Sequence, residues 1–331
     1  MAEKFTGRSL SIEEIYNLLE NEWVENIKCT APFNYDELVN FVNAYTVGIE
    51  ETYPLNNESA SKFQPYIFLL HFSVAYNHFS YEKLSKLLTG EVIHKNSSTN
   101  ERNPLTDLLI LQLWRQKNFA LDNLVRSFCV GREFQAFQQL RSYIESCQII
   151  FLLLTDFEAL TRFINSELGA EEYRKLWWKH LSPSKIGKRI KANKQRILDE
   201  ENRNNILTMD VRKEEIGHNS EFTKKLLDVC NDYLHWNKDA IFHHAFDKDK
   251  SGFRIQGETD WSKSSKANLV NFIEVVSYST NWIESALACH VSVFNRHTNE
   301  SDLDGETLKY LHSMFTITAT YNGLYDFAKN A

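Results

Sequence analysis

The sequence predicts an all-α protein, a multi-helix bundle with a smaller helical region at its N-terminus. Apolar residues recur at helical spacing along most of the chain, and no segment alternates for long enough to build a sheet. No proline follows Pro183, so the C-terminal half can form long helices. The 331 residues are 43% hydrophobic and 13% aromatic, which is enough for a substantial core.

The N-terminal part contains three segments with the pattern of helices. Ser11 and Glu14 have the spacing of a capping box, which predicts a first helix of about a dozen residues. Further helices are predicted over 35–50 and 64–88. Segment 90–103 then loses all apolar periodicity and is rich in Ser, Thr, Asn and charge, as linkers are. We therefore predict an N-terminal helical region over 1–93, a linker over 94–104 and a main bundle over 105–331.

The main bundle is predicted to begin with two long helices separated by Gly131. The pattern continues through shorter helical segments, and long ones return near the C-terminus. Residues 253–256 are the exception, since they suit one arm of a short hairpin. The predicted helices are 105–128, 132–154, 155–168, 171–180, 220–246, 265–296 and 305–328.

Charge, cysteine content and hydropathy limit the classes of protein to which this chain can belong. A formal net charge of −7 excludes a surface built throughout to coat nucleic acid, so any such contact must be regional. Five scattered cysteines in mostly apolar surroundings indicate reduced, buried thiols, not a disulfide framework. The N-terminal sequence has no apolar segment of the secretory type, and the longest apolar run, 147–154, is too short to span a bilayer. We expect a cytoplasmic protein with no membrane partner.

Most motifs of high specificity are missing. The sequence has no phosphate-binding GxxxxGK[ST], no dinucleotide-binding GxGxxG, no HExxH, no GxSxG and no paired CxxC. We therefore expect no P-loop hydrolysis, no serine hydrolysis of that type and no structural zinc, and we predict no cofactor.

The segment YLHWNKDAIFHHAFDKDK, which begins at Tyr233, concentrates titratable side chains. At helical spacing His235, Asp239 and His243 share one face. The segment resembles the C-terminal helix of the HEPN superfamily, helical bundles of bacterial abortive-infection and toxin–antitoxin systems. Lys238 stands where that family has an arginine, Asp239 supplies its polar neighbour, and His243 or His244 supplies its histidine.

The resemblance implies metal-independent RNA cleavage. The histidine would act as general acid or base, and the cation beside it would hold the phosphate. Lysine supplies charge but lacks the bidentate grip of a guanidinium. The plain alternative is that His243 and His244 are a histidine pair at a helix C-terminus, favoured by the helix dipole, with Lys238 and Asp239 on a solvated face.

Arg141 and Glu145 lie one turn apart in an apolar helix. Facing the interior, they would join the His235–His244 helix in a polar pocket, where Arg141 would supply the guanidinium that the motif lacks. Facing outward, they would be an ordinary surface ion pair.

A basic run follows two tryptophans, Trp177 and Trp178. The run predicts a helix that grips RNA phosphates while the indoles stack on bases, although a solvated charged face has the same pattern. Its six cations are Lys185, Lys188, Arg189, Lys191, Lys194 and Arg196.

The acidic segment from Asp247 to Glu258 matches the spacing of a calcium-binding loop, with Asp249, Ser251 and Gly252 in register. Arg254 occupies the position where such a loop has an aliphatic residue, and no second loop pairs with it. We expect a solvated turn that does not bind calcium tightly.

Two interpretations of function remain. The first is a HEPN-like endoribonuclease of phage defence or a toxin–antitoxin system, with RNA and an antitoxin-like partner or a second copy of the chain as its partners. The second is a non-catalytic helical protein that binds a ligand or another protein.

Overall fold

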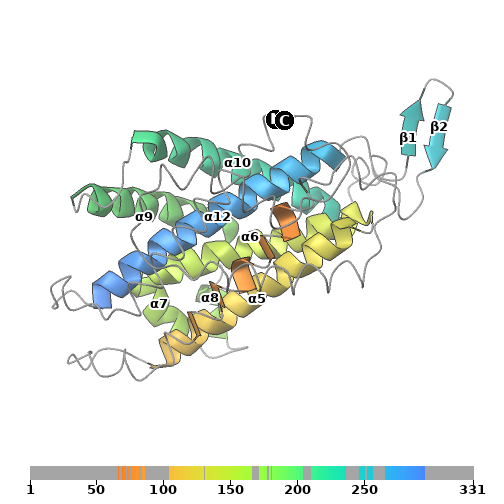
Figure 1. Cartoon of the computed structure of the whole chain (residues 1–331). Coiled ribbons are helices and arrows are strands. Elements are labelled where there is room, and N and C mark those ends of the chain that lie inside the picture. The colour runs from red at the N-terminus through yellow and green to blue at the C-terminus, as the bar shows by residue number, and fades with distance from the viewer. Residues whose placement is uncertain are drawn as a thin grey trace.

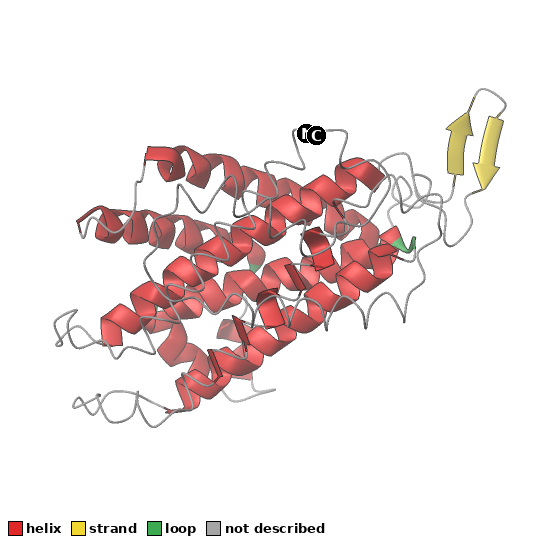
Figure 2. Ribbon diagram, viewed as in Figure 1, coloured by secondary structure: helices red, strands yellow, loops and turns green. Residues whose placement is uncertain are grey.

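The computed structural model describes residues 104–129, 131–165, 171–176, 181–203, 210–235, 246–249, 252–255 and 265–294, together with Lys179 and individual positions between 66 and 85. This part of the chain is almost entirely helical (Figure 2), so the all-α prediction is confirmed. Its helices are α5 (Pro104–Cys129), α6 (Glu133–Thr155), α7 (Phe157–Ile164), α8 (Glu171–Leu176), α9 (Pro183–Arg203), α10 (Asp210–Leu234) and α12 (Ser265–Phe294).

Helix α6 lies at the centre of the bundle, with α5, α9, α10 and α12 packed around it. Figure 1 shows these long helices side by side, with α7 and α8 at one end. The apolar character of α6 explains this position, because its C-terminal residues from Ile150 to Thr155 are all buried.

A glycine ends α5 and turns the chain into α6. Gly131 has φ of 77°, a conformation that costs a residue without Cβ nothing. Its amide donates to Phe128 O at 2.9 Å, and the amide of Arg132 donates to Ser127 O at 2.8 Å. These two bonds form a Schellman motif, so Gly131 separates the helices as its position in the sequence predicts.

Aromatic side chains join the central helix to two of its neighbours. Phe137 of α6 stacks on Tyr233 of α10, with ring centroids 4.3 Å apart. On α12, Phe272 meets Phe137 edge-on at 5.0 Å and Phe128 of α5 at 5.4 Å. This cluster fixes α10 and α12 against α6 at the end of the bundle nearest Gly131.

The described residues between 66 and 85 are helical and belong to the same hydrophobic core as α5 and α6. Polar contacts add to the packing: Lys117 Nζ of α5 donates to Asn77 Oδ1 at 2.6 Å, and Asn118 Nδ2 donates to Asn77 O at 2.8 Å. These contacts cross the predicted linker, so the described part of the N-terminal region packs directly on the main bundle.

Two short antiparallel strands, β1 (Phe246–Asp249) and β2 (Gly252–Ile255), form a hairpin that projects from one end of the bundle (Figure 1). The expected hairpin arm at 253–256 is therefore present, shifted by one residue. The structure also corrects two helices. Helix α10 begins at Asp210 and ends at Leu234 where the sequence predicted 220–246, and α7 runs from Phe157 to Ile164 where it predicted 155–168.

Candidate functional site

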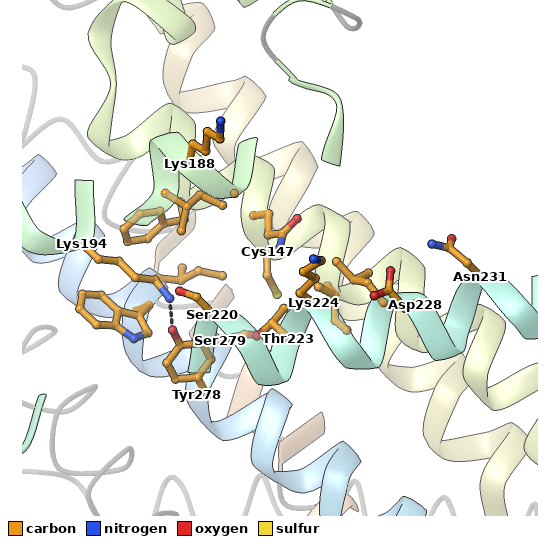
Figure 3. Close-up of a pocket in the computed structure, with 18 residues that line it drawn as sticks. Cys147, Lys188, Lys194, Ser220, Thr223, Lys224, Asp228, Asn231, Tyr278 and Ser279 are labelled. Carbon is orange, nitrogen blue, oxygen red and sulfur yellow. Dashed lines mark hydrogen bonds between the residues drawn. The ribbon is translucent and has the colours of Figure 1, made fainter. Parts of the chain in front are cut away.

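A pocket of about 540 Å³ lies between α6, α9, α10 and α12. Each helix contributes one face to it. On α6 the lining residues are Ile144, Cys147, Gln148 and Phe151, which recur at the i, i+3, i+4, i+7 spacing of a single stripe. On α10 the stripe runs from Ser220 to Asn231, and Figure 3 shows five of its side chains, Ser220, Thr223, Lys224, Asp228 and Asn231, along this helix.

The walls of the pocket are mostly apolar, with polar groups at a few positions. Pockets that bind small molecules have this size and composition, because apolar surface provides affinity and a few polar groups fix orientation. The apolar residues are Ile144, Phe151, Ile190, Leu227, Trp282 and Ile283.

Lys194 of α9 occupies an aromatic corner of the pocket. Only 5% of its surface is exposed, and its amine lies 4.0 Å from the centroid of the Tyr278 ring and 4.6 Å from that of Trp282. The amine also donates a hydrogen bond to Tyr278 Oη (Figure 3). Ring faces attract cations, so this corner holds a positive charge at the inner wall.

Thr223 of α10 presents a buried hydroxyl to the same pocket. The residue is 8% exposed, and its Oγ1 has no hydrogen-bond partner among the described residues. The neighbouring hydroxyl of Ser220, by contrast, donates to Ile216 O at 2.7 Å. Buried polar groups are nearly always paired, so Thr223 Oγ1 is an exception that a hydrogen bond from a ligand or an ordered water would remove.

Three further charged side chains line the pocket: Lys188 of α9, and Lys224 and Asp228 of α10. All three are exposed, and none forms an ion pair with a described residue, although Lys224 and Asp228 are one turn apart. In Figure 3 Asp228 lies at the end of the pocket away from Lys194. The lining therefore holds three lysines and one carboxylate.

Cys147 lines the pocket but is not an activated nucleophile. Burial raises the pKa of its thiol to about 11, and the charge of Lys117 acts in the opposite direction without reversing this effect. A thiol with so high a pKa is protonated at neutral pH. The geometry thus supports binding and gives no support to covalent catalysis by Cys147.

The predicted ion pair is present, in an intermediate environment. Arg141 Nε lies 2.9 Å from Glu145 Oε1, with side chains 23% and 28% exposed. Arg141 Nη1 is buried and has no hydrogen-bond partner in the part of the chain that the structure describes, and the guanidinium charge acts on the Cys230 thiol of α10. Neither residue lines the pocket between α6, α9, α10 and α12. That pocket is therefore not the polar pocket that the sequence predicted around this ion pair.

His235 is exposed and follows the last residue of α10, with its amide bonded to Asn231 O at 2.9 Å. Lys238, Asp239, His243 and His244 lie outside the described residues, so the HEPN-like motif stays a prediction.

The six cations of the basic run point in different directions. Lys185, Lys188 and Lys191 are exposed, whereas Lys194 is buried. Arg189 forms an ion pair with Asp156, with Nη2 and Oδ2 2.6 Å apart, and Arg196 donates to Thr155 O. Three of the six thus have partners within the bundle, and Trp177 and Trp178 lie outside the residues whose side chains are described.

The acidic segment forms part of the hairpin. Asp247 and Asp249 lie on β1, where Asp247 pairs with Arg254 across the strands. Residues 256–258 lie outside the described part. Among the described residues no group of three His, Cys, Asp or Glu side chains is placed to hold a metal ion.

The sequence interpretation missed Thr223, Tyr278 and Trp282. Each lies on a helix that was expected, but a hydroxyl or an aromatic residue on a core-facing stripe has the pattern of ordinary packing. Only the position of Lys194 carried a signal, because it falls in register with Ile186, Ile190 and Ile197 on the apolar face of α9.

Comparisons with models of protein families, with curated proteins and with solved structures find no match to this chain. None of the described helices combines the length and apolar character needed to cross a membrane.

Proposed function

We propose that this protein binds a small molecule in the pocket between α6, α9, α10 and α12. The observation that carries the proposal is a cavity of about 540 Å³ with mostly apolar walls and a buried hydroxyl, Thr223 Oγ1, that has no partner within the described helices and strands. A helical bundle with such a cavity suits the second interpretation of the sequence, a non-catalytic ligand-binding protein.

A neutral fluorescent probe tests the proposal. N-Phenyl-1-naphthylamine brightens in apolar surroundings and is small enough for a cavity of this size. Gly187 provides a way to block the pocket, because it lines the cavity and a Cβ added there meets no atom within 4 Å. Gly187→Phe should place a ring in the cavity while leaving the core intact.

The matched control is Ala192→Phe, which adds the same ring at an exposed position on the same helix. We expect saturable binding of one probe molecule to the wild type and to Ala192→Phe, and binding at least about tenfold weaker to Gly187→Phe. Equal binding by all three proteins would overturn the proposal, and so would a wild type that binds neither this probe nor a charged analogue of it.

A second candidate function is the metal-independent RNA cleavage implied by the HEPN resemblance. It is supported by Arg141. The buried Nη1 of this residue has no partner among the residues that the structure describes, and its charge acts on α10, the helix that leads into the histidine segment. An arginine close to such histidines would hold the scissile phosphate.

The test of this second function is incubation of the purified protein with total RNA in EDTA. We expect cleavage that is lost in His243→Ala or His244→Ala and strongly reduced in Arg141→Gln. Intact RNA at high protein concentration would remove this candidate without affecting the proposal for the pocket.

A further inference from the structure

The charges that line the pocket are unlike those of the whole chain. The chain carries a formal net charge of −7, yet the lining has Lys188, Lys194 and Lys224 against the single carboxylate of Asp228. Lys194 is buried, so less water screens its charge than the charge of a lysine on an open surface. The field inside the pocket therefore favours a negative ligand.

Hydrogen-bond donors line the cavity. Thr223 has a hydroxyl proton to donate and no partner among the described residues, and the amine of Lys194, which already donates to Tyr278 Oη, has further protons. Anionic oxygens accept short, strong hydrogen bonds from such groups. A neutral apolar ligand would leave the Thr223 hydroxyl buried and unpaired, which is costly.

Aromatic rings surround the same corner of the pocket. Trp282 and Phe151 both line the cavity, and their rings meet edge-on with centroids 6.1 Å apart. Rings of this size give a large apolar contact to a flat group. The corner thus combines a positive charge with aromatic walls, and the Thr223 hydroxyl lines the same pocket.

We propose that the ligand of this pocket is a small organic anion that carries a flat ring. Its charged group, a carboxylate, phosphate or sulfonate, accepts hydrogen bonds from Thr223 Oγ1 and from the amines of Lys194 and Lys224. Its ring packs beside Trp282. Lys188, at the rim, adds attraction as the ligand enters. This inference rests on the proposed function and names the class of ligand that the pocket takes.

Two dyes that differ by one group separate the two proposals. 8-Anilinonaphthalene-1-sulfonate is N-phenyl-1-naphthylamine with a sulfonate added, so the pair isolates the effect of the charge. We expect the wild type to bind the sulfonate roughly tenfold more tightly than the neutral probe at low salt, with the difference shrinking as salt is added. Equal or weaker binding of the sulfonate would overturn the anion proposal and leave the proposed function standing, whereas binding of neither dye would remove both.

Substitutions of single lysines then test which positive charges bind the sulfonate. Lys224→Gln alters an exposed side chain, so the fold should be retained, and Lys194→Met removes the buried amine while keeping its length. Each should weaken sulfonate binding by about five- to tenfold and change binding of the neutral dye by less than about twofold. The control is Lys225→Gln, next to Lys224 but outside the pocket and paired with Glu221 at 3.0 Å.

Should Lys194→Met fail to fold, Lys224→Gln and a Thr223→Val variant complete the test. Thr223→Val keeps the shape and removes the hydroxyl, so sulfonate binding should weaken while neutral binding holds or tightens. Unchanged sulfonate binding in both variants would contradict the proposal.

Discussion

The amine of Lys117 donates a hydrogen bond of 2.6 Å to Asn77 Oδ1 in a part of the core where Lys117 has no exposed surface. The amine also lies 4.2 Å from the centroid of the Trp114 ring. No carboxylate of a described residue forms an ion pair with it. Burial lowers the pKa of Lys117 to about 8, and the field of Cys147 acts weakly the other way.

The first prediction concerns stability at alkaline pH. The folded state holds the Lys117 proton less tightly than the unfolded chain does. The cost in stability of burying the charged amine is therefore complete below pH 8, and it disappears as the pH rises from 8 toward 10.5. Over that range the free energy of unfolding of the wild type should rise relative to Lys117→Met by roughly 2–3 kcal/mol. Urea titrations of both proteins at several pH values measure the difference, and parallel curves would contradict it.

The second prediction concerns acid. Burial lowers the pKa of His71 to about 4, and the charge of Asp122 only partly opposes this. Between pH 6.5 and 4 the unfolded chain takes up this proton and the folded protein does not, so stability falls as the pH falls. Between pH 7 and 4.5 the wild type should lose roughly 2–3 kcal/mol more than His71→Leu. Equal losses in the two proteins would show that His71 is protonated as readily in the fold as outside it.

The third prediction concerns Asp156, which joins α6, α7 and α9. Its Oδ1 accepts a hydrogen bond from the Ala159 amide at 2.9 Å as the N-cap of α7, and its Oδ2 lies 2.6 Å from Arg189 Nη2. Asp156→Ala removes both contacts and should lower the free energy of unfolding by about 1–2 kcal/mol.

The matched variant is Asp156→Asn, which keeps an oxygen for the cap and removes the charge. Its loss should be below that of Asp156→Ala, because Asp156→Asn retains the cap and loses only the ion pair with Arg189, in which the two side chains are 25% and 16% exposed. Chemical denaturation of the two variants measures both losses. If Asp156→Asn loses as much stability as Asp156→Ala, the ion pair with Arg189 contributes more to the free energy of unfolding than the cap does.

Much of the fold could be predicted from the sequence, because helices depend on local patterns. Gly131 marked the end of α5, and Pro183 begins α9, where its missing amide costs nothing. The end of α10 could not be predicted, since the apolar pattern continues past Leu234 and tertiary contacts determine where a helix stops.

The pocket could not be predicted from the sequence, for a different reason. Its lining comes from four helices, and each stripe alone has the pattern of core packing. Lys117 illustrates the same limit. It shares a face with Trp114, Leu121 and Leu124, which predicts burial, but Asn77 and its hydrogen bond lie forty positions away in the sequence.

A crystal structure of the protein soaked with 8-anilinonaphthalene-1-sulfonate would show directly whether the four-helix pocket holds a small organic anion. We expect the naphthalene ring between α6 and α12, beside Trp282, with a sulfonate oxygen within hydrogen-bond distance of Thr223 Oγ1. Dye bound only outside the pocket, or a cavity closed by the side chains that line it, would contradict both the position and the class of the ligand that we propose.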